Sequence, residues 1–102
     1  MTDSPSKLAE TALSANPAPW FLYVLECRGG SLYTGISNDV TRRYAAHCAG
    51  KGARYTRMHP PERLALVLEC ADKGAALQAE AAVKRLDAAA KRAWLAAQQV
   101  NQ

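Results

Sequence analysis

Several protein classes leave marks in a sequence that this one lacks. No apolar run among its 102 residues approaches the roughly 18 residues that a membrane span needs, so we expect no membrane-spanning segment. The N-terminal region has a single lysine, Lys7, and no apolar segment, so we expect no secretory signal there. No internal repeat is visible.

Cysteine is also scarce. The three cysteines, Cys27, Cys48 and Cys70, are odd in number and widely spaced. Without a CxxC or a CxxC…HxxxH pattern, they encode neither a disulfide framework nor a zinc site. Cys27 and Cys70 fall in predicted strands, where we interpret them as small core residues. Free thiols of this kind lead us to expect a reducing cytoplasm.

What is present predicts one small folded domain with a slight excess of positive charge. A chain of this length forms a single domain, and 49% hydrophobic residues suffice for a modest core. The net charge of +4 suits a polyanion such as nucleic acid but is weak evidence alone. We expect a flexible leader at 1–19, the folded domain at 20–99 and a frayed end at 100–102.

The predicted fold class is α/β (α+β), a β-β-α-β-α-α sandwich with a three-stranded, mostly antiparallel sheet flanked by helices. Strands are expected over 20–27, 32–36 and 63–70, and helices over 39–49, 72–86 and 88–99. Paired glycines at Gly29 and Gly30 predict a tight turn in the first hairpin. Gly35, inside a strand, indicates a place where another group approaches the backbone closely.

Helix phase directs two chemically active side chains of the first predicted helix toward the sheet. On the first helix Arg43 and His47 lie at the edge of an apolar stripe of Val40, Tyr44 and Cys48. The structural alternative is a surface arginine beside a histidine bonded to a backbone carbonyl.

A carboxylate lies in the apolar arc of the second helix. Glu80 falls among the stripe residues Ala76, Ala79 and Val83. A carboxylate there is costly unless it is paired, hydrogen-bonded or bound to a metal. A salt bridge to Lys84, one turn later, is therefore an equal alternative to a metal site.

The tyrosines of the first hairpin are ambiguous in isolation. Strand aromatics such as Tyr23 and Tyr33 are more often core residues than catalysts. Symmetric pairing across a four-residue turn would place Tyr33 opposite Glu26, with Tyr23 displaced along the ladder. The spacing does not by itself bring the two phenols together.

Taken together, these residues resemble the GIY-YIG nuclease superfamily, in particular its small stand-alone bacterial members. The first motif appears as Phe21-Leu22-Tyr23 and the second as Tyr33-Thr34-Gly35, with Arg43, His47 and Glu80 in register. The similarity runs from Trp20 to about Leu95. Many superfamily members also have an asparagine a helical stretch after the glutamate, where this chain has Lys91, Arg92 and Trp94.

The resemblance implies a one-metal hydrolysis of phosphodiester bonds. It makes Glu80 the ligand of one Mg²⁺ or Mn²⁺, a hard cation that retains most of its waters. It makes Arg43 the clamp on the phosphate and His47 a proton relay or a support for a tyrosine. Either Tyr23 or Tyr33 would orient or deprotonate the attacking water, and the resemblance leaves that choice open.

The expected function is a metal-dependent DNA endonuclease that is structure-selective or nonspecific. No base-reading helix is visible, and the expected nucleic-acid contacts lie in a basic loop of Lys51, Arg54, Tyr55 and Arg57. A solvated loop anchored by Tyr55 is an equal alternative. Two rival functions are a nucleic-acid-binding module without catalysis and a protein-interaction domain that uses the helix of Trp94. The oligomeric state is open.

Overall fold

One antiparallel sheet organises the structure, a computed structural model that describes residues 19–100. Its strands are β2 (Trp20–Cys27), β3 (Leu32–Ser37) and β4 (Pro61–Cys70), in the order β3-β2-β4. The predicted fold class is confirmed. Of the predicted leader only Pro19 lies within the described residues, and 101–102 of the expected frayed end also lie outside them. No helix within residues 19–100 is long and apolar enough to cross a membrane.

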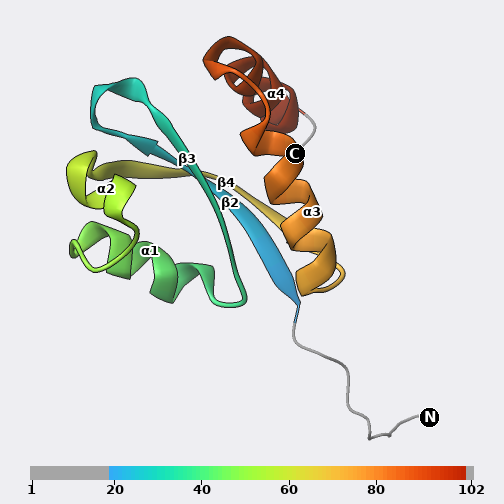
Figure 1. Cartoon of the computed structure of the whole chain (residues 1–102), viewed down its shortest axis with the longest axis horizontal. Helices are drawn as coiled ribbons and strands as arrows, with labels where there is room; N and C mark the ends of the chain where they lie inside the picture. The colour runs from blue at the N-terminus through green and yellow to red at the C-terminus, as the bar shows by residue number, and fades with distance from the viewer. Residues whose placement is uncertain (1–18, 101–102) are drawn as a thin grey trace, which may run out of the picture.

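Four helices lie on the two sides of this sheet (Figure 1). Helices α1 (Val40–Cys48) and α2 (Arg54–Met58) lie on one side, and α3 (Lys73–Lys84) and α4 (Ala88–Val100) lie on the other. The short α2 differs from the prediction, which had a basic loop there. Five residues are too few for a hydrophobic period to show.

The central strand β2 supplies the core of both faces, because successive side chains of a strand alternate between them. Leu22 and Val24 point to the α3 and α4 side, where they pack with Val83 and Leu95. Tyr23, Leu25 and Cys27 point to the α1 side. Residues 22 to 25 of this strand are all buried, so both of its faces are covered there.

The predicted pairing of the first hairpin is wrong by one residue. Tyr33 lies opposite Leu25, not Glu26, and Tyr23 lies opposite Gly35. The reason is that the turn has three residues and not the four of the prediction. Arg28–Gly30 form a 3-10 turn, which is closed by a hydrogen bond from the Cys27 N–H to the Ser31 carbonyl. Gly29 and Gly30 both have positive φ, as expected of the paired glycines.

Two side-chain predictions on the helices and the third strand also change. Cys48, expected in the apolar stripe of α1, is exposed, and His47 is the buried residue of that helix. The centre of β4 is buried at Ala65 and Leu66, whereas Val67 on the opposite face is exposed. Trp94 packs against the core beside Leu95, so α4 covers the sheet.

The start of α3 allows a first test of the fold, because this helix positions Glu80. The Asp72 carboxylate caps the helix by accepting a hydrogen bond of 2.8 Å from the Ala75 N–H. We expect Asp72→Ala to lower the free energy of unfolding by about 1 kcal/mol, as measured by urea denaturation. Asp72→Asn, which keeps an acceptor oxygen, should retain most of the stability. Equal losses in the two variants would contradict the capping role.

Candidate active site

The central feature of the site is a buried hydrogen bond between the first tyrosine and the histidine of α1. The Tyr23 hydroxyl lies 2.8 Å from His47 Nε2, and each residue is only 1% exposed. This bond joins the central strand to α1 across 24 residues of sequence. Helix phase predicted His47 at the margin of the core, and the structure places it fully inside.

A threonine on α2 determines which nitrogen of His47 carries the proton. Thr56 Oγ1 donates to the Ala53 carbonyl at 2.9 Å and also lies 2.7 Å from His47 Nδ1. Because the single hydroxyl proton is already used, Nδ1 must be the donor in that second bond. Nε2 is then the unprotonated nitrogen of a neutral ring, and it accepts the proton of the Tyr23 hydroxyl.

The electrostatics of the pair agree with this neutral arrangement. Burial, with a smaller contribution from Arg43, lowers the pKa of His47 below its usual 6.5. Burial also raises the pKa of Tyr23 above its usual 10.0; Arg43 opposes this shift, whereas Tyr33 and Glu80 reinforce it. At neutral pH both partners are therefore uncharged, and the phenol retains its proton.

Two glycines make room for the pair. A Cβ on Gly35 would stand 2.5 Å from the Tyr23 hydroxyl oxygen, and a Cβ on Gly52 would overlap the His47 imidazole. The close approach expected at Gly35 is thus made by the phenol of its own cross-strand partner. Any side chain at either position would displace the Tyr23–His47 bond.

The second tyrosine lies on the same face, between the buried pair and the surface. The Tyr33 ring centroid is 5.2 Å from that of His47 and 6.4 Å from that of Tyr23. Tyr33 is only partly buried, whereas Tyr23 is almost completely buried. The two tyrosines therefore stand at different depths in one cluster.

Arg43 and Glu80 approach this cluster from helices on opposite sides of the sheet. Arg43 on α1 is close enough to lower the pKa of both Tyr23 and His47, and Glu80 on α3 is close enough to raise that of Tyr23. Within residues 19–100 no carboxylate forms a salt bridge with Arg43. The five residues predicted for the site thus converge, and their catalytic roles remain predictions.

Glu80 forms the salt bridge that sequence reasoning offered as its alternative role. Its Oε2 lies 3.3 Å from Lys84 Nζ, and its side chain is 21% exposed. Lys84 Nζ also stands 6.0 Å from the centre of the Tyr33 ring. This carboxylate is therefore partly solvated and paired to a half-exposed lysine that also lies near the outer tyrosine.

The donor set fits a weakly held divalent cation of the Mg²⁺ type and no tighter metal site. No group of three or more His, Cys, Asp or Glu side chains able to hold a metal occurs in the described part of the chain. A single accessible carboxylate matches the way Mg²⁺ binds proteins, through one or two carboxylates together with waters and substrate phosphate.

The residues predicted to contact nucleic acid lie at and around α2. Lys51, Arg54 and Arg57 are exposed, so each can reach a phosphate. Tyr55 is 38% exposed, and its ring stacks on Tyr33 with centroids 5.8 Å apart and lies 4.7 Å from His59. Tyr55 therefore anchors α2 against the site and still has an accessible edge.

Sequence reasoning missed Thr56, Gly52 and Lys84 as contributors to the site. Thr56 is buried and bonded to His47, yet nothing in a run of basic and aromatic residues distinguishes it. Lys84 was considered only as the partner of Glu80. Recognition of these residues required the folded arrangement of α2 and α3.

The chain is similar to several known proteins. Residues 19–93 match the family described as the GIY-YIG catalytic domain. A UPF0213 protein of Xanthomonas axonopodis pv. citri is 52% identical over 80 residues, 78% of each chain. One from Neisseria meningitidis serogroup A is 48% identical over 77 residues, 76% of this chain and 85% of the relative. The solution NMR structure of a UPF0213 protein from Bacillus halodurans is 40% identical, with a TM-score of 0.51, and covers 76% of this chain and 83% of that one.

The hydrogen-bond chain predicts a definite histidine tautomer. We expect ¹⁵N NMR of the imidazole to show His47 protonated on Nδ1 and unprotonated on Nε2 at neutral pH. Thr56→Val leaves the Nδ1 proton without an acceptor and should lower the free energy of unfolding by about 1–3 kcal/mol. Thr56→Ser retains the acceptor and should preserve both the tautomer and the stability. A proton on Nε2 in the unaltered protein would refute the assignment.

Proposed function

The chain belongs to the GIY-YIG family, and from this premise we propose that it is a metal-dependent endonuclease that hydrolyses phosphodiester bonds in DNA. The family's catalytic domain implies a nuclease-type fold and nucleic acid, in general, as the partner. The observation that best supports the proposal is the Tyr23–His47 hydrogen bond, with Tyr33, Arg43 and Glu80 around it.

In this proposal Tyr23 is the tyrosine that handles the proton. Its oxygen accepts a proton from the attacking water while its own proton passes to His47 Nε2, 2.8 Å away. The concerted transfer never creates a free phenolate, which its burial disfavours. The Nδ1 bond to Thr56 persists throughout and holds the imidazole in place.

Tyr33 and Arg43 handle the phosphate. Tyr33 stands between Tyr23 and the surface, so in this proposal the attacking water reaches Tyr23 from the side on which Tyr33 lies. The Tyr33 hydroxyl hydrogen-bonds the phosphate. Arg43, which has no carboxylate partner within residues 19–100, binds the phosphate oxygens as negative charge builds.

Glu80 is the residue proposed to hold Mg²⁺ or Mn²⁺, with Lys84 displaced from its carboxylate. Such a cation polarises the scissile phosphate and neutralises charge on the leaving oxygen. In the structure Lys84 Nζ stands 6.0 Å from the centre of the Tyr33 ring, so on release from Glu80 it would be available to a phosphate.

We propose structure-selective or nonspecific cutting of DNA in the cytoplasm. The exposed cations Lys51, Arg54 and Arg57 support contacts to phosphates rather than to base edges. Three free cysteines fit the reducing setting of the cytoplasm. The interaction-domain rival is less well supported, because Trp94 is packed against the core.

The first functional prediction concerns cleavage. With Mg²⁺ or Mn²⁺ the protein should cut labelled DNA, EDTA should abolish the cutting, and Glu80→Gln should do the same. Arg43→Ala should reduce the rate by roughly 100-fold or more, because a donor to the developing charge is lost.

Matched controls separate these effects from general loss of charge. Arg42→Ala removes the exposed neighbour of Arg43, and Glu69→Gln removes an exposed carboxylate on β4. Both controls should cut at close to the normal rate. Binding without cleavage in every metal would favour the binding-module rival, and neither binding nor cleavage would favour the interaction domain.

The second functional prediction concerns pH. Because His47 must be neutral and its pKa is lowered from 6.5, kcat/KM should fall only below about pH 6.5. Above that point it should stay level, since the pKa of Tyr23 is raised from 10.0 and the phenol works in its protonated form. A rate that rises about tenfold per pH unit through the alkaline range would instead indicate a phenolate base.

A further inference from the structure

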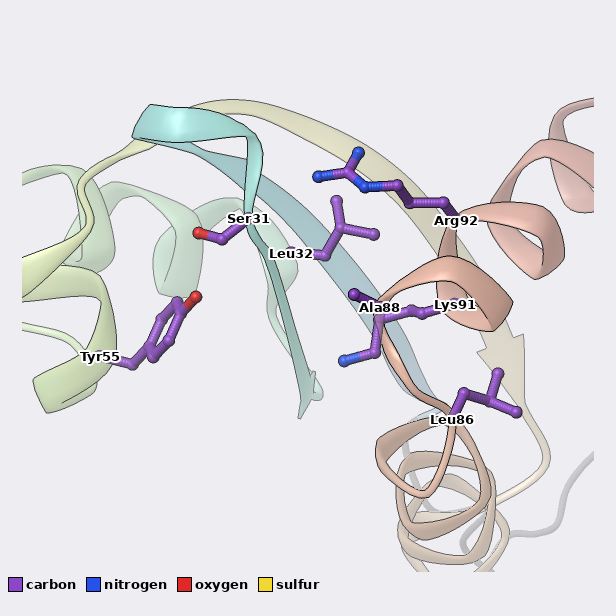
Figure 2. A pocket seen from close by; sticks show the side chains of 7 residues that line it. All are labelled: Ser31, Leu32, Tyr55, Leu86, Ala88, Lys91 and Arg92. Atoms are coloured by element: carbon purple, nitrogen blue, oxygen red, sulfur yellow. The ribbon is translucent and has the colours of Figure 1, made fainter.

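A second concave site lies beside the tyrosine cluster, between the hairpin turn and the start of α4. Its volume is about 240 Å³. The polar lining comes from Ser31, Tyr55, Lys91 and Arg92, and the apolar lining includes Leu32 and Leu86. Figure 2 shows Lys91 and Arg92 reaching from α4 toward the hairpin, with Tyr55 on the opposite side of the pocket.

The pocket has positive charge without a matching carboxylate. Within residues 19–100 neither Lys91 nor Arg92 forms a salt bridge, and the nearby Glu80 is paired with Lys84. Burial, and then the positive charge of Lys84, lowers the pKa of Lys91. Arg92 packs over the turn, 3.4 Å from where a Cβ on Gly30 would stand. These cations are placed to receive an anion.

Ser31 adds an unused hydrogen-bonding group to the lining. Its Oγ is buried and has no partner among the described residues. A buried hydroxyl without a partner carries a desolvation cost that a ligand oxygen or nitrogen would relieve. In Figure 2 the Ser31 hydroxyl and the Tyr55 hydroxyl lie on one side of β3, and the Lys91 amine lies on the other side of that strand.

Tyr55 and Lys84 connect the pocket with the proposed active site. Tyr55 lines the pocket with its accessible edge and stacks on Tyr33, with ring centroids 5.8 Å apart. Lys84 also relates the active site to the pocket. It is paired with Glu80 of the proposed active site, and its positive charge lowers the pKa of Lys91 in the pocket. A strand whose scissile phosphate lies at Tyr33 and Arg43 would therefore bring an adjacent nucleotide to this pocket.

We propose that the pocket binds one unpaired nucleotide of the substrate strand, next to the bond that is cut. Lys91 and Arg92 hold its phosphate, the Ser31 and Tyr55 hydroxyls bond its polar edge, and Leu32 and Leu86 contact its apolar surface. This inference rests on the proposed nuclease function and gives it a substrate class: DNA with a splayed, flapped or single-stranded nucleotide at the cleavage point.

The size of the pocket supports a single nucleotide. Sites for drug-sized molecules measure about 300–1,000 Å³, and this one, at about 240 Å³, lies just below that range. A base that is still paired and stacked in a duplex cannot enter a recess of this kind, so entry requires a nucleotide that is already free or has been unstacked. The site therefore favours junctions and ends over intact duplex.

The test compares two DNAs of equal length and equal phosphate number, one fully paired and one splayed into single strands at one end. Binding is measured in EDTA at fixed ionic strength, so that neither cleavage nor salt enters the comparison. The unaltered protein should bind the splayed DNA more tightly. Lys91→Gln combined with Arg92→Gln should weaken that binding by roughly tenfold or more and remove the preference.

Arg42→Gln is the matched control, because it removes an exposed arginine from α1, on the other side of the sheet. It should weaken binding to both DNAs by the same small factor. A mononucleotide probe, deoxyadenosine 5′-monophosphate, should shift the NMR signals of Ser31 and Tyr55, and the double variant should lose those shifts. Shifts elsewhere, or none, would count against the pocket.

The outcomes for the pocket and for the nuclease are separable. If the double variant keeps the preference for splayed DNA, the pocket proposal is wrong, even if the protein cleaves DNA. If the preference is present and is lost in the double variant while no metal supports cleavage, the pocket proposal stands and the nuclease proposal fails.

Discussion

The register of the β2–β3 hairpin is the constraint on which the site depends. Side chains alternate between the two faces of a sheet, so a slip of one residue would send one tyrosine to the opposite face from the other. The 3-10 turn at Arg28–Gly30 places Tyr33 opposite Leu25, two residues along the ladder from Tyr23. Both phenols therefore face α1, where His47 can bond one of them and contact the other.

The position of β3 at the edge of the sheet explains how groups from both sides reach the same cluster. Gly35 carries no side chain, so the Tyr23 phenol lies across the backbone of this outermost strand. At that edge α1 contributes His47 and Arg43, and α3, which packs on the other face, contributes Glu80. A site at the centre of the sheet would have been closed to one of the two helices.

Much of this arrangement could be predicted from the sequence, and the remainder has identifiable physical causes. The strand of Trp20–Cys27 was predicted with its observed bounds, and the second long helix was predicted to begin within one residue of its observed start at Lys73, from local signals that act within a turn. The resemblance to the GIY-YIG family is confirmed by the family match over residues 19–93. These features depend on neighbours in the sequence or on motifs with conserved order.

The errors arise where tertiary contacts decide the outcome. The prediction assumed the length of the hairpin turn. The observed pairing differs by one residue, and this shift puts Tyr33 on the same face of the sheet as Tyr23. His47 is buried because the imidazole has two hydrogen-bond partners inside, and Cys48, the next residue of the helix, then points in another direction and is exposed. The role of Thr56 follows only from its contact with His47, nine residues away, which no local pattern specifies.

The neutral groups of the site lie deep and its charged groups lie near the surface, and this separation follows from the cost of burying charge. The inner pair, Tyr23 and His47, is buried and neutral, which suits the proposed proton transfer between groups that stay uncharged at rest. The charged groups Glu80 and Lys84 stand nearer the solvent, where ions are tolerated and exchange partners easily. On the proposed function, Glu80 would hold the cation, and in the structure its carboxylate is paired with Lys84 instead. On the same proposal, the buried pair provides the proton path, the exchangeable charges lie outside it, and the complete reaction centre forms only around substrate.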